Sequence, residues 1–330
     1  MRILVTGGAG FIGSVVVAQL IAAKHDVVIY DDLSNGNKGA IPADAALVVG
    51  NVGDRDCLDR VFHRYNFDAV MHFAAFIEAG ESMKTPERYF RNNTANTLAL
   101  LEAMLAHKVN RMVFSSTAAV YGNPKRTPIV ETDPLLPTNA YGESKLLVEQ
   151  ILSWFHRIHG FSYASLRYFN AAGATEELGE MHAPETHLVP LILQVASGKR
   201  DHASIFGTDY STPDGSCIRD YIHVSDLASA HLLALRALAE MRGPRSLIFN
   251  LGNGKGFSVR EVIECARIVT GHSIPIVEAE RRPGDPAILV ASPEKIREEL
   301  GWTPQNSELK SIVASAWSWY QRHAGGYNAE

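Results

Sequence analysis

The stretch Arg2-Ile-Leu-Val-Thr-Gly-Gly-Ala-Gly-Phe-Ile-Gly13 carries the strongest structural signal in the chain. Residues 2–6 form a short apolar run that is typical of a buried strand, and glycines end it. The residues from Phe11 onward are typical of a helix. The glycines therefore lie between a strand and a helix, where the backbone can approach a pyrophosphate held at the helix N-terminus. This order predicts a dinucleotide-binding α/β fold, and a simple turn after the strand is the alternative for the glycines taken alone.

A carboxylate follows at the end of the next predicted strand. Asp31 closes the apolar run 27–30 and lies 18 residues after Gly13. In this fold, a carboxylate at that place accepts a hydrogen bond from an adenosine ribose hydroxyl and repels the 2′-phosphate of NADP. No basic residue follows until Lys38, so the sequence favours NAD over NADP as the cofactor.

Apolar runs and helical stretches continue to alternate after Asp31. The apolar runs are 46–49, 69–73, 111–115 and 163–167, and the helical stretches between them include 87–107 and 144–158. Alternation of this kind predicts an α/β protein with a doubly wound parallel Rossmann sheet and helices on both faces.

The alternation stops after Asn170, where the sequence becomes rich in Gly, His, Pro and Asp. Helical and apolar stretches resume further on, including a helical stretch at 225–241. We therefore expect a Rossmann domain at 1–172, to which the chain returns at about 222–268. A smaller mixed α/β domain at 173–330 is expected to be interleaved with it and to bind the substrate.

The composition is that of a folded globular protein. The 330 residues are 46% hydrophobic and 20% charged, and 31 basic against 36 acidic residues give a net charge of −5. The basic residues are scattered, so we expect no nucleic-acid partner. The uncharged run 3–23 contains four glycines and therefore does not read as a membrane span.

The three cysteines lie far apart at Cys57, Cys217 and Cys265. An odd number at this spacing gives neither a disulfide framework nor a cysteine metal site. They are typical of buried thiols in a reducing compartment, so we expect a cytoplasmic protein.

The segment Tyr141-Gly-Glu-Ser-Lys145 places a tyrosine and a lysine four residues apart, on one face of a predicted helix. It follows Thr117, which lies at the end of a predicted strand, where this fold keeps its chemistry. A tyrosine base needs its pKa lowered by roughly three units from about 10, and a cation about 4 Å away supplies roughly that shift. We therefore expect Lys145 to lower the pKa of Tyr141 and Thr117 to orient a substrate hydroxyl. A surface pair is the alternative for any such spacing taken singly.

With further motifs, these residues resemble the nucleotide-sugar epimerases of the extended short-chain dehydrogenase/reductase superfamily over essentially the whole chain. The matching motifs are His72-Phe-Ala-Ala75, Gly80-Glu-Ser82, Asn92-Asn93, Phe114 to Gly122, Leu166 to Gly173, Arg219 to Val224 and Arg281-Arg-Pro-Gly-Asp285. The last three motifs separate these epimerases from other dehydrogenases of the superfamily.

The resemblance implies that Tyr141, Lys145 and Thr117 are catalytic and that NAD stays bound. The residues implied for NAD are Gly7, Gly10, Phe11, Ile12, Gly13, Asp31, Asn51, Val52, Phe73, Ala74, Ala75, Asn92, Ser115, Tyr141, Lys145 and Tyr168. The residues implied for a UDP-sugar are Thr117, Tyr141, Asn170, Leu188, Arg219, Arg282 and Asp285. The guanidinium groups of two arginines can donate hydrogen bonds to diphosphate oxygens. A surface ion pair is the alternative for each arginine.

Two positions depart from the family pattern. Asn51 stands where an acid near the adenine amine is expected, and its carbonyl oxygen can still accept a hydrogen bond. Leu289 stands where other members have a large aromatic residue or a small cysteine that limits the room around the sugar C2 substituent. The acceptance of N-acetylated sugars is therefore left open.

The implied reaction interconverts UDP-glucose and UDP-galactose, as in galactose metabolism, through transient hydride transfer from sugar C4 to NAD and rotation of a 4-keto intermediate. A 4-epimerase of a UDP-N-acetylhexosamine, UDP-pentose or UDP-uronate is an alternative. A non-catalytic NAD-sensing protein is an alternative of another class. A 4,6-dehydratase is not expected, because Ala118 and Ala119 stand where that family has Asp and Glu.

A pair of histidines on one predicted helix has a spacing that could suit a metal ion. His156 and His159 lie one helical turn apart, but their neighbours Trp154, Phe155 and Ile158 are typical of a packed helix face. No carboxylate completes a ligand set there. We therefore expect no metal site.

The helical stretches 87–107 and 144–158 carry more apolar surface than one sheet face needs. The residues concerned are Leu98, Leu101, Met104, Leu147, Ile151, Trp154 and Phe155. The resemblance implies a homodimer through a four-helix interface, and packing within the monomer is the alternative.

Overall fold

A seven-stranded parallel sheet forms the centre of the computed structural model, which describes residues 1–240, 243–282, 284–323 and 326–327. Its order is β3-β2-β1-β4-β5-β6-β11. The strands are β1 (Arg2–Thr6), β2 (Asp26–Asp31), β3 (Ala46–Val49), β4 (Ala69–His72), β5 (Arg111–Thr117), β6 (Ser162–Tyr168) and β11 (Ser246–Leu251). The predicted doubly wound sheet is confirmed. The strand order reverses between β1 and β4, which opens a crevice at the carboxyl ends of the strands.

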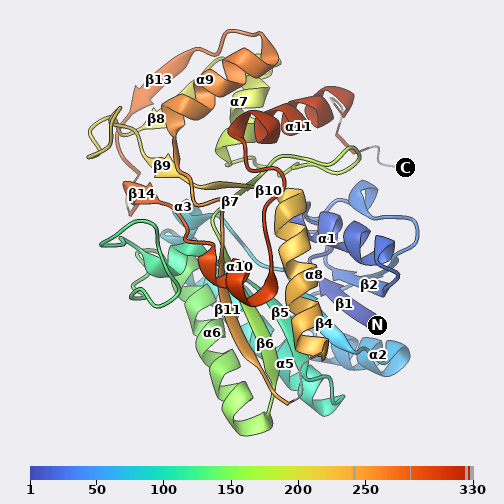
Figure 1. The fold of residues 1–330 in the computed structure, drawn as a ribbon. Helices are drawn as coiled ribbons and strands as arrows, with labels where there is room; N and C mark the ends of the chain where they lie inside the picture. The colour runs from blue at the N-terminus through green and yellow to red at the C-terminus, as the bar shows by residue number, and fades with distance from the viewer. Residues whose placement is uncertain (241–242, 283, 324–325, 328–330) are drawn as a thin grey trace.

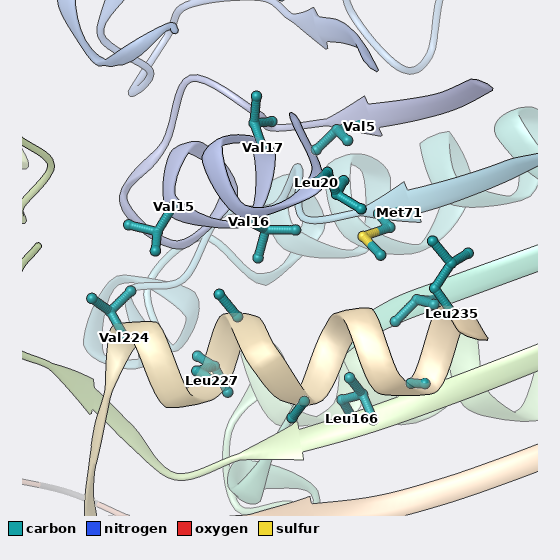
Figure 2. Close-up of a cluster of buried hydrophobic side chains, with 14 of the residues drawn as sticks. Val5, Val15, Val16, Val17, Leu20, Met71, Leu166, Val224, Leu227 and Leu235 are labelled. Carbon is teal, nitrogen blue, oxygen red and sulfur yellow. The ribbon is translucent and has the colours of Figure 1, made fainter. Parts of the chain in front are cut away.

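Helices cover both faces of this sheet, and each face has its own apolar core. One face carries α1 (Phe11–Ala22) and α8 (Val224–Glu240), and Figure 2 shows Val16 of α1 facing α8, which carries Leu227 and Leu235. The other face carries α2 (Arg55–Tyr65), α5 (Asn96–Ala106) and α6 (Ala140–His159). Within the described residues, no helix is both long and apolar enough to span a membrane.

The helix predicted at 87–107 differs from the structure. It divides into α4 (Pro86–Tyr89), a π-helical turn η2 (Phe90–Ala95) and α5. Within the turn, the Asn93 side chain accepts a hydrogen bond from the Phe76 backbone N–H at 2.9 Å and donates to the Phe76 carbonyl at 3.0 Å. This side chain ties the helix to the loop after β4, a tertiary interaction that helical periodicity does not reveal. Such widened turns are frequent at functional sites.

A second lobe lies at one end of the sheet, at the top of Figure 1. Its strands pair as β7 (Asn170–Ala172) with β10 (Tyr221–His223), β8 (Ala203–Phe206) with β13 (Ile276–Ala279), and β9 (Ile218–Arg219) between β12 (Phe257–Ser258) and β14 (Ile288–Leu289). Its helices are α7 (Leu188–Ala196), α9 (Val259–Thr270) and α11 (Leu309–Arg322), which share a separate apolar core. Short elements η1 (Lys38–Ala40), α3 (Ala79–Ser82), η3 (Ala118–Tyr121) and α10 (Glu294–Leu300) complete the chain.

We propose a division into a Rossmann domain and an interleaved second domain that differs from the sequence expectation in one respect. The expected return of the chain at 222–268 covers α8, which packs on the sheet, and β11, which is one of its strands. It also covers α9, but Val262 and Ile263 of that helix are buried in the second core. The amphipathic pattern of α9 shows that one face is buried and does not show against what. Residue 241 of the predicted helix 225–241 lies outside the described residues.

A buried ion pair joins α6 to the sheet. The guanidinium of Arg167 on β6 donates to both carboxylate oxygens of Glu149 on α6, at 2.6 and 3.0 Å. Ser116 of β5 also donates to Glu149, and Arg167 donates to the Tyr121 hydroxyl at 2.8 Å. Both charged side chains are almost fully buried, and their hydrogen bonds offset the cost of removing them from water.

We predict that Glu149→Met lowers the free energy of unfolding by about 3–5 kcal/mol, because it leaves the Arg167 charge buried without a partner. Replacing both residues with methionine should recover much of that loss. Urea denaturation followed by circular dichroism measures the effect. Glu102→Met is the control, because Glu102 is exposed and its pair with Arg55 should contribute less than about 1 kcal/mol. An equal loss in the single and double variants would contradict the prediction.

Candidate active site

One cavity of about 1160 Å³ runs along the carboxyl ends of the sheet strands and continues to the second lobe. Nearly all the residues predicted to bind NAD or a UDP-sugar line this cavity. These are Gly7, Gly10, Phe11, Ile12, Gly13, Asp31, Asn51, Val52, Phe73, Ala74, Ala75, Asn92, Ser115, Thr117, Tyr141, Tyr168, Asn170, Leu188, Arg219, Arg282 and Asp285. Lys145 is the exception, since it lies behind the cavity wall. Pro283 of the predicted 281–285 motif lies outside the described residues.

The glycine turn at one end of the cavity allows close backbone approaches. Gly7 has a φ of +71°, and a Cβ there would lie 2.5 Å from the backbone nitrogen of Ala74. A Cβ at Gly13 would lie 2.1 Å from the Gly7 carbonyl oxygen. Side chains at either position would therefore collide with backbone. The turn leaves the N-terminus of α1 open to the cavity, without a side-chain cap at Gly10.

Asp31 lies beside this turn. Its carboxylate accepts hydrogen bonds from the backbone N–H groups of Ala9 and Leu33, both at 2.9 Å. Burial raises the pKa of Asp31, and these two hydrogen bonds oppose that shift. The carboxylate is thus held rigidly at the end of β2, where it can accept a hydrogen bond from a ribose hydroxyl.

The structure shows what Asn51 does in place of the expected acid. Its side-chain oxygen accepts from the Gly53 backbone N–H at 2.9 Å, and its amide donates to Asp32 at 2.8 Å. Asn51 therefore shapes the loop after β3 and brings the Asp32 carboxylate to the cavity wall. Its oxygen is already used within the protein, which the sequence did not reveal.

Tyr141 and Thr117 lie together in the cavity, in contact with each other. Tyr141 is the second residue of α6, and the N-cap of that helix is Asn139, whose side chain accepts a hydrogen bond from Gly142 N at 2.8 Å. Thr117 ends β5, and its hydroxyl accepts from Ala119 N at 3.1 Å. A helix N-terminus and a strand end thus place the two hydroxyl groups at the crevice.

Lys145 lies one helical turn further along α6 and is fully enclosed. Its ammonium group donates to the Ser115 carbonyl at 2.8 Å and lies 5.0 Å from the centre of the Phe114 ring. Burial lowers the pKa of Lys145 to about 7. The charge on this side chain therefore depends on what else occupies the site.

We expected Lys145 to lower the pKa of Tyr141, but in the protein alone the pKa of Tyr141 is raised. Burial raises the pKa of Tyr141 to about 12, contact with the Thr117 hydroxyl opposes the shift, and the Glu78 charge adds to it. Desolvation of the phenolate is the largest of these effects, and the Lys145 charge is not among the causes of the shift. Losing the Tyr141 proton at neutral pH therefore needs further positive charge.

The far end of the cavity contains the predicted arginines. Arg219 on β9 is buried and forms an ion pair with Asp285, whereas we expected these residues to contact different parts of a ligand. The Arg282 guanidinium lies 4.0 Å from the centre of the Phe206 ring. Leu289 pairs with Arg219 between parallel strands and also lines the cavity.

Sequence reasoning missed one group of cavity residues. Glu180, His182, Glu185 and His187 lie in the irregular segment before α7 and line the same cavity. Their ligand atoms lie within 4.8 Å of one another. The signal was visible in the sequence, because two acids and two histidines occur within eight residues.

Comparisons with known proteins agree on one family. The model of the NAD dependent epimerase/dehydratase family matches residues 3–252. The chain is 51% identical to the UDP-glucose 4-epimerase of Halalkalibacterium halodurans, over 100% of this chain and 98% of that protein. It is 52% identical to the UDP-glucose 4-epimerase of Streptomyces lividans, over 99% of this chain and 98% of that protein.

Solved structures agree with the sequence comparisons. A crystal structure of UDP-glucose 4-epimerase superposes with a TM-score of 0.96 at 47% identity, with all of both chains covered. The Bifidobacterium longum UDP-glucose 4-epimerase in complex with NAD+ and UDP superposes with a TM-score of 0.93 at 38% identity, over 99% of this chain and 100% of that one. The chain belongs to the NAD dependent epimerase/dehydratase family.

Proposed function

We propose that this chain is a UDP-glucose 4-epimerase that interconverts UDP-glucose and UDP-galactose with NAD as cofactor. One observation carries the proposal: Tyr141 and Thr117 share a cavity with the glycine turn on one side and with Arg219 and Arg282 on the other. Relatives with that name match over nearly the whole chain, which supports the same reaction here.

The residues at the first end of the cavity fit NAD. Only glycine fits at positions 7 and 13, so the backbone is bare where a pyrophosphate would approach the start of α1. The Asp31 carboxylate would accept a hydrogen bond from the adenosine ribose. With Asp32 also on the cavity wall, a 2′-phosphate would meet two carboxylates. The site therefore favours NAD over NADP.

The second end fits a uridine diphosphate. We propose that the Arg219 and Arg282 guanidinium groups bind diphosphate oxygens, while Asp285, released from its pair with Arg219, accepts from a ribose hydroxyl. Asn170 and Leu188 also line the cavity. The charged contacts therefore hold the nucleotide, and the sugar is left free to turn.

Tyr141 is the proposed base in both directions. It accepts the proton of the sugar 4-hydroxyl, which Thr117 orients, and returns it after the 4-keto sugar has rotated. NAD, when bound, supplies the hydride acceptor and the positive charge of its oxidised ring. Bringing the pKa of Tyr141 from about 12 to 7 requires about 7 kcal/mol. One charge about 4 Å away supplies about 4 kcal/mol, so we propose that the Lys145 ammonium and the cofactor are both needed.

The test of the proposed function is to incubate the purified chain with UDP-galactose, without added cofactor, and to couple UDP-glucose formation to UDP-glucose dehydrogenase. We expect UDP-glucose to form, with NAD retained from purification. If none forms even with added NAD, the hexose assignment is wrong. UDP-xylose, UDP-glucuronate and UDP-N-acetylglucosamine would then be the next substrates.

We predict that Tyr141→Phe lowers kcat by about 10²–10⁴, because it removes the proton acceptor and keeps the ring. The variant should still retain NAD, measured as nucleotide released on denaturation. Tyr163→Phe is the control, since Tyr163 lies at the opposite end of the sheet from the cavity and should leave kcat unchanged. A Tyr141→Phe variant with more than a tenth of the original kcat would contradict the assignment.

We further propose a cytoplasmic homodimer that serves galactose metabolism. The three cysteines form no disulfide, which supports a reducing compartment. Of the apolar residues expected at the interface, Leu101 and Met104 are fully buried within the monomer. Leu98 on α5 is exposed, and so are Trp154 and Ile158 on α6. These three exposed side chains support an interface on α5 and α6.

We predict that Trp154→Glu combined with Ile158→Glu converts the dimer into a monomer, because it places two charges in the apolar interface. Size-exclusion chromatography with light scattering measures the change. Ile268→Glu on α9 is the matched control, because Ile268 is 66% exposed, similar to Ile158 at 68%. A variant that stays dimeric would show that the interface lies elsewhere, and a monomeric parent chain would overturn the proposal.

A further inference from the structure

Four side chains able to bind a metal converge in the segment between β7 and α7. Glu180, His182, Glu185 and His187 each contribute one nitrogen or oxygen atom to a group in which all atoms lie within 4.8 Å of one another. All four residues line the wall of the large cavity. None of them belongs to the residues proposed for NAD or for the UDP-sugar.

The contacts centre on the Glu180 carboxylate. One of its oxygens lies 2.7 Å from Nδ1 of His187 and 3.2 Å from Nδ1 of His182. The Glu185 carboxylate lies 3.1 Å from Nδ1 of His187 and 3.9 Å from Nδ1 of His182. Two imidazole rings thus face the same two carboxylates.

Burial makes this arrangement costly without a cation. The Glu180 and Glu185 side chains are only 7% and 5% exposed. Two buried carboxylates need compensating positive charge.

The imidazole of His182 is the stronger evidence for a bound cation. Nδ1 of His182 is buried and makes no hydrogen bond, although a Glu180 oxygen lies 3.2 Å away. The ring nitrogen therefore points among the carboxylates without the geometry of a hydrogen bond. A buried nitrogen lone pair beside two carboxylates is what a metal ion requires.

We propose that Glu180, His182, Glu185 and His187 bind one Zn²⁺ ion. Imidazole nitrogen and carboxylate oxygen are both common ligands of zinc, and a divalent ion neutralises both carboxylates. Two imidazoles disfavour Mg²⁺ and Ca²⁺, which take oxygen ligands. Ligand atoms at about 2.0 Å from a tetrahedral ion lie about 3.3 Å from one another. The four atoms here lie within 4.8 Å of one another, so side-chain rotations would bring them to that distance. This proposal departs from our expectation that the chain has no metal site.

The ion would hold the cavity wall in place. His187 is the residue that precedes α7, and its side chain makes no capping hydrogen bond to that helix. Leu188, the next residue, lines the cavity where the nucleotide is proposed to lie. Zinc would therefore fix the start of α7 and seat Leu188. This consequence rests on the proposed function, whereas zinc binding itself does not.

The test uses the full chain without a histidine tag, stripped of metal with EDTA and titrated with ZnCl₂ by calorimetry. We expect one zinc per chain, and no site in the double variant His182→Ala with His187→Ala. His159→Ala is the matched control, since His159 is exposed on α6, and it should keep the site. A stripped parent chain that binds no more zinc than the double variant would overturn the proposal.

Thermal unfolding separates a lost site from a lost fold. Zinc should raise the Tm of the parent chain and of His159→Ala, and should not raise that of a folded double variant. Glu185→Gln keeps the side-chain shape and should bind zinc at least tenfold more weakly. An unchanged affinity in that variant would remove Glu185 from the site.

The positioning role has its own measurement. Removal of zinc should raise the KM for UDP-galactose and leave kcat and the retained NAD unchanged. An unchanged KM would overturn the positioning role and leave the metal site standing. If the parent chain does not convert UDP-galactose at all, the proposed function fails, while the calorimetry still reports on zinc.

Discussion

The buried ion pair between Glu149 and Arg167 holds α6 against the sheet, and the proposed chemistry depends on where that helix lies. Tyr141, Lys145 and Glu149 are four residues apart and share one face of α6. Glu149 is tied to β6 through Arg167, and Lys145 is tied to β5 through the Ser115 carbonyl. Tyr141 is therefore placed over the strand ends by two charged contacts further along the same helix.

The same burial that fixes these groups also sets their charges. Lys145 has a pKa lowered to about 7, and His72, between Thr6 and Thr97, has a pKa lowered to about 3 by burial and by the Lys145 charge. The surroundings of Tyr141 thus oppose charge of either sign. In the proposed reaction, a bound charge would have to change this balance before Tyr141 could lose its proton. The base strength of Tyr141 in that reaction is linked to the bound cofactor, which would limit proton transfer outside the complete complex.

Much of the first half of the fold follows from the sequence, since buried parallel strands and amphipathic helices leave regular patterns. The glycine turn, Asp31 and the Tyr141 to Lys145 spacing could all be placed before any coordinates. Three features could not. The π-helical turn at Asn93 depends on a contact with Phe76, far along the chain. The place of α9 depends on which core buries it, and the raised pKa of Tyr141 depends on solvent exclusion by residues from several elements.

The second lobe shows why short strands need other constraints. Its strands are only two to four residues long, so few ladder hydrogen bonds hold them. The Asp220 carboxylate compensates by accepting from the backbone N–H groups of Asn253, Gly254 and Ala291.

Among the described residues, the Glu185 carboxylate accepts hydrogen bonds only from the neighbouring backbone groups of Thr186 and His187 and from the His187 ring. It therefore gives the segment before α7 no equivalent long-range constraint. Those bonds close a local turn. A cation shared with Glu180 and His182 would join both ends of the segment, as Asp220 joins distant loops elsewhere in this lobe. The cavity wall before α7, which has no regular structure, would thereby gain the rigidity that the sheet gives to Tyr141 and Thr117.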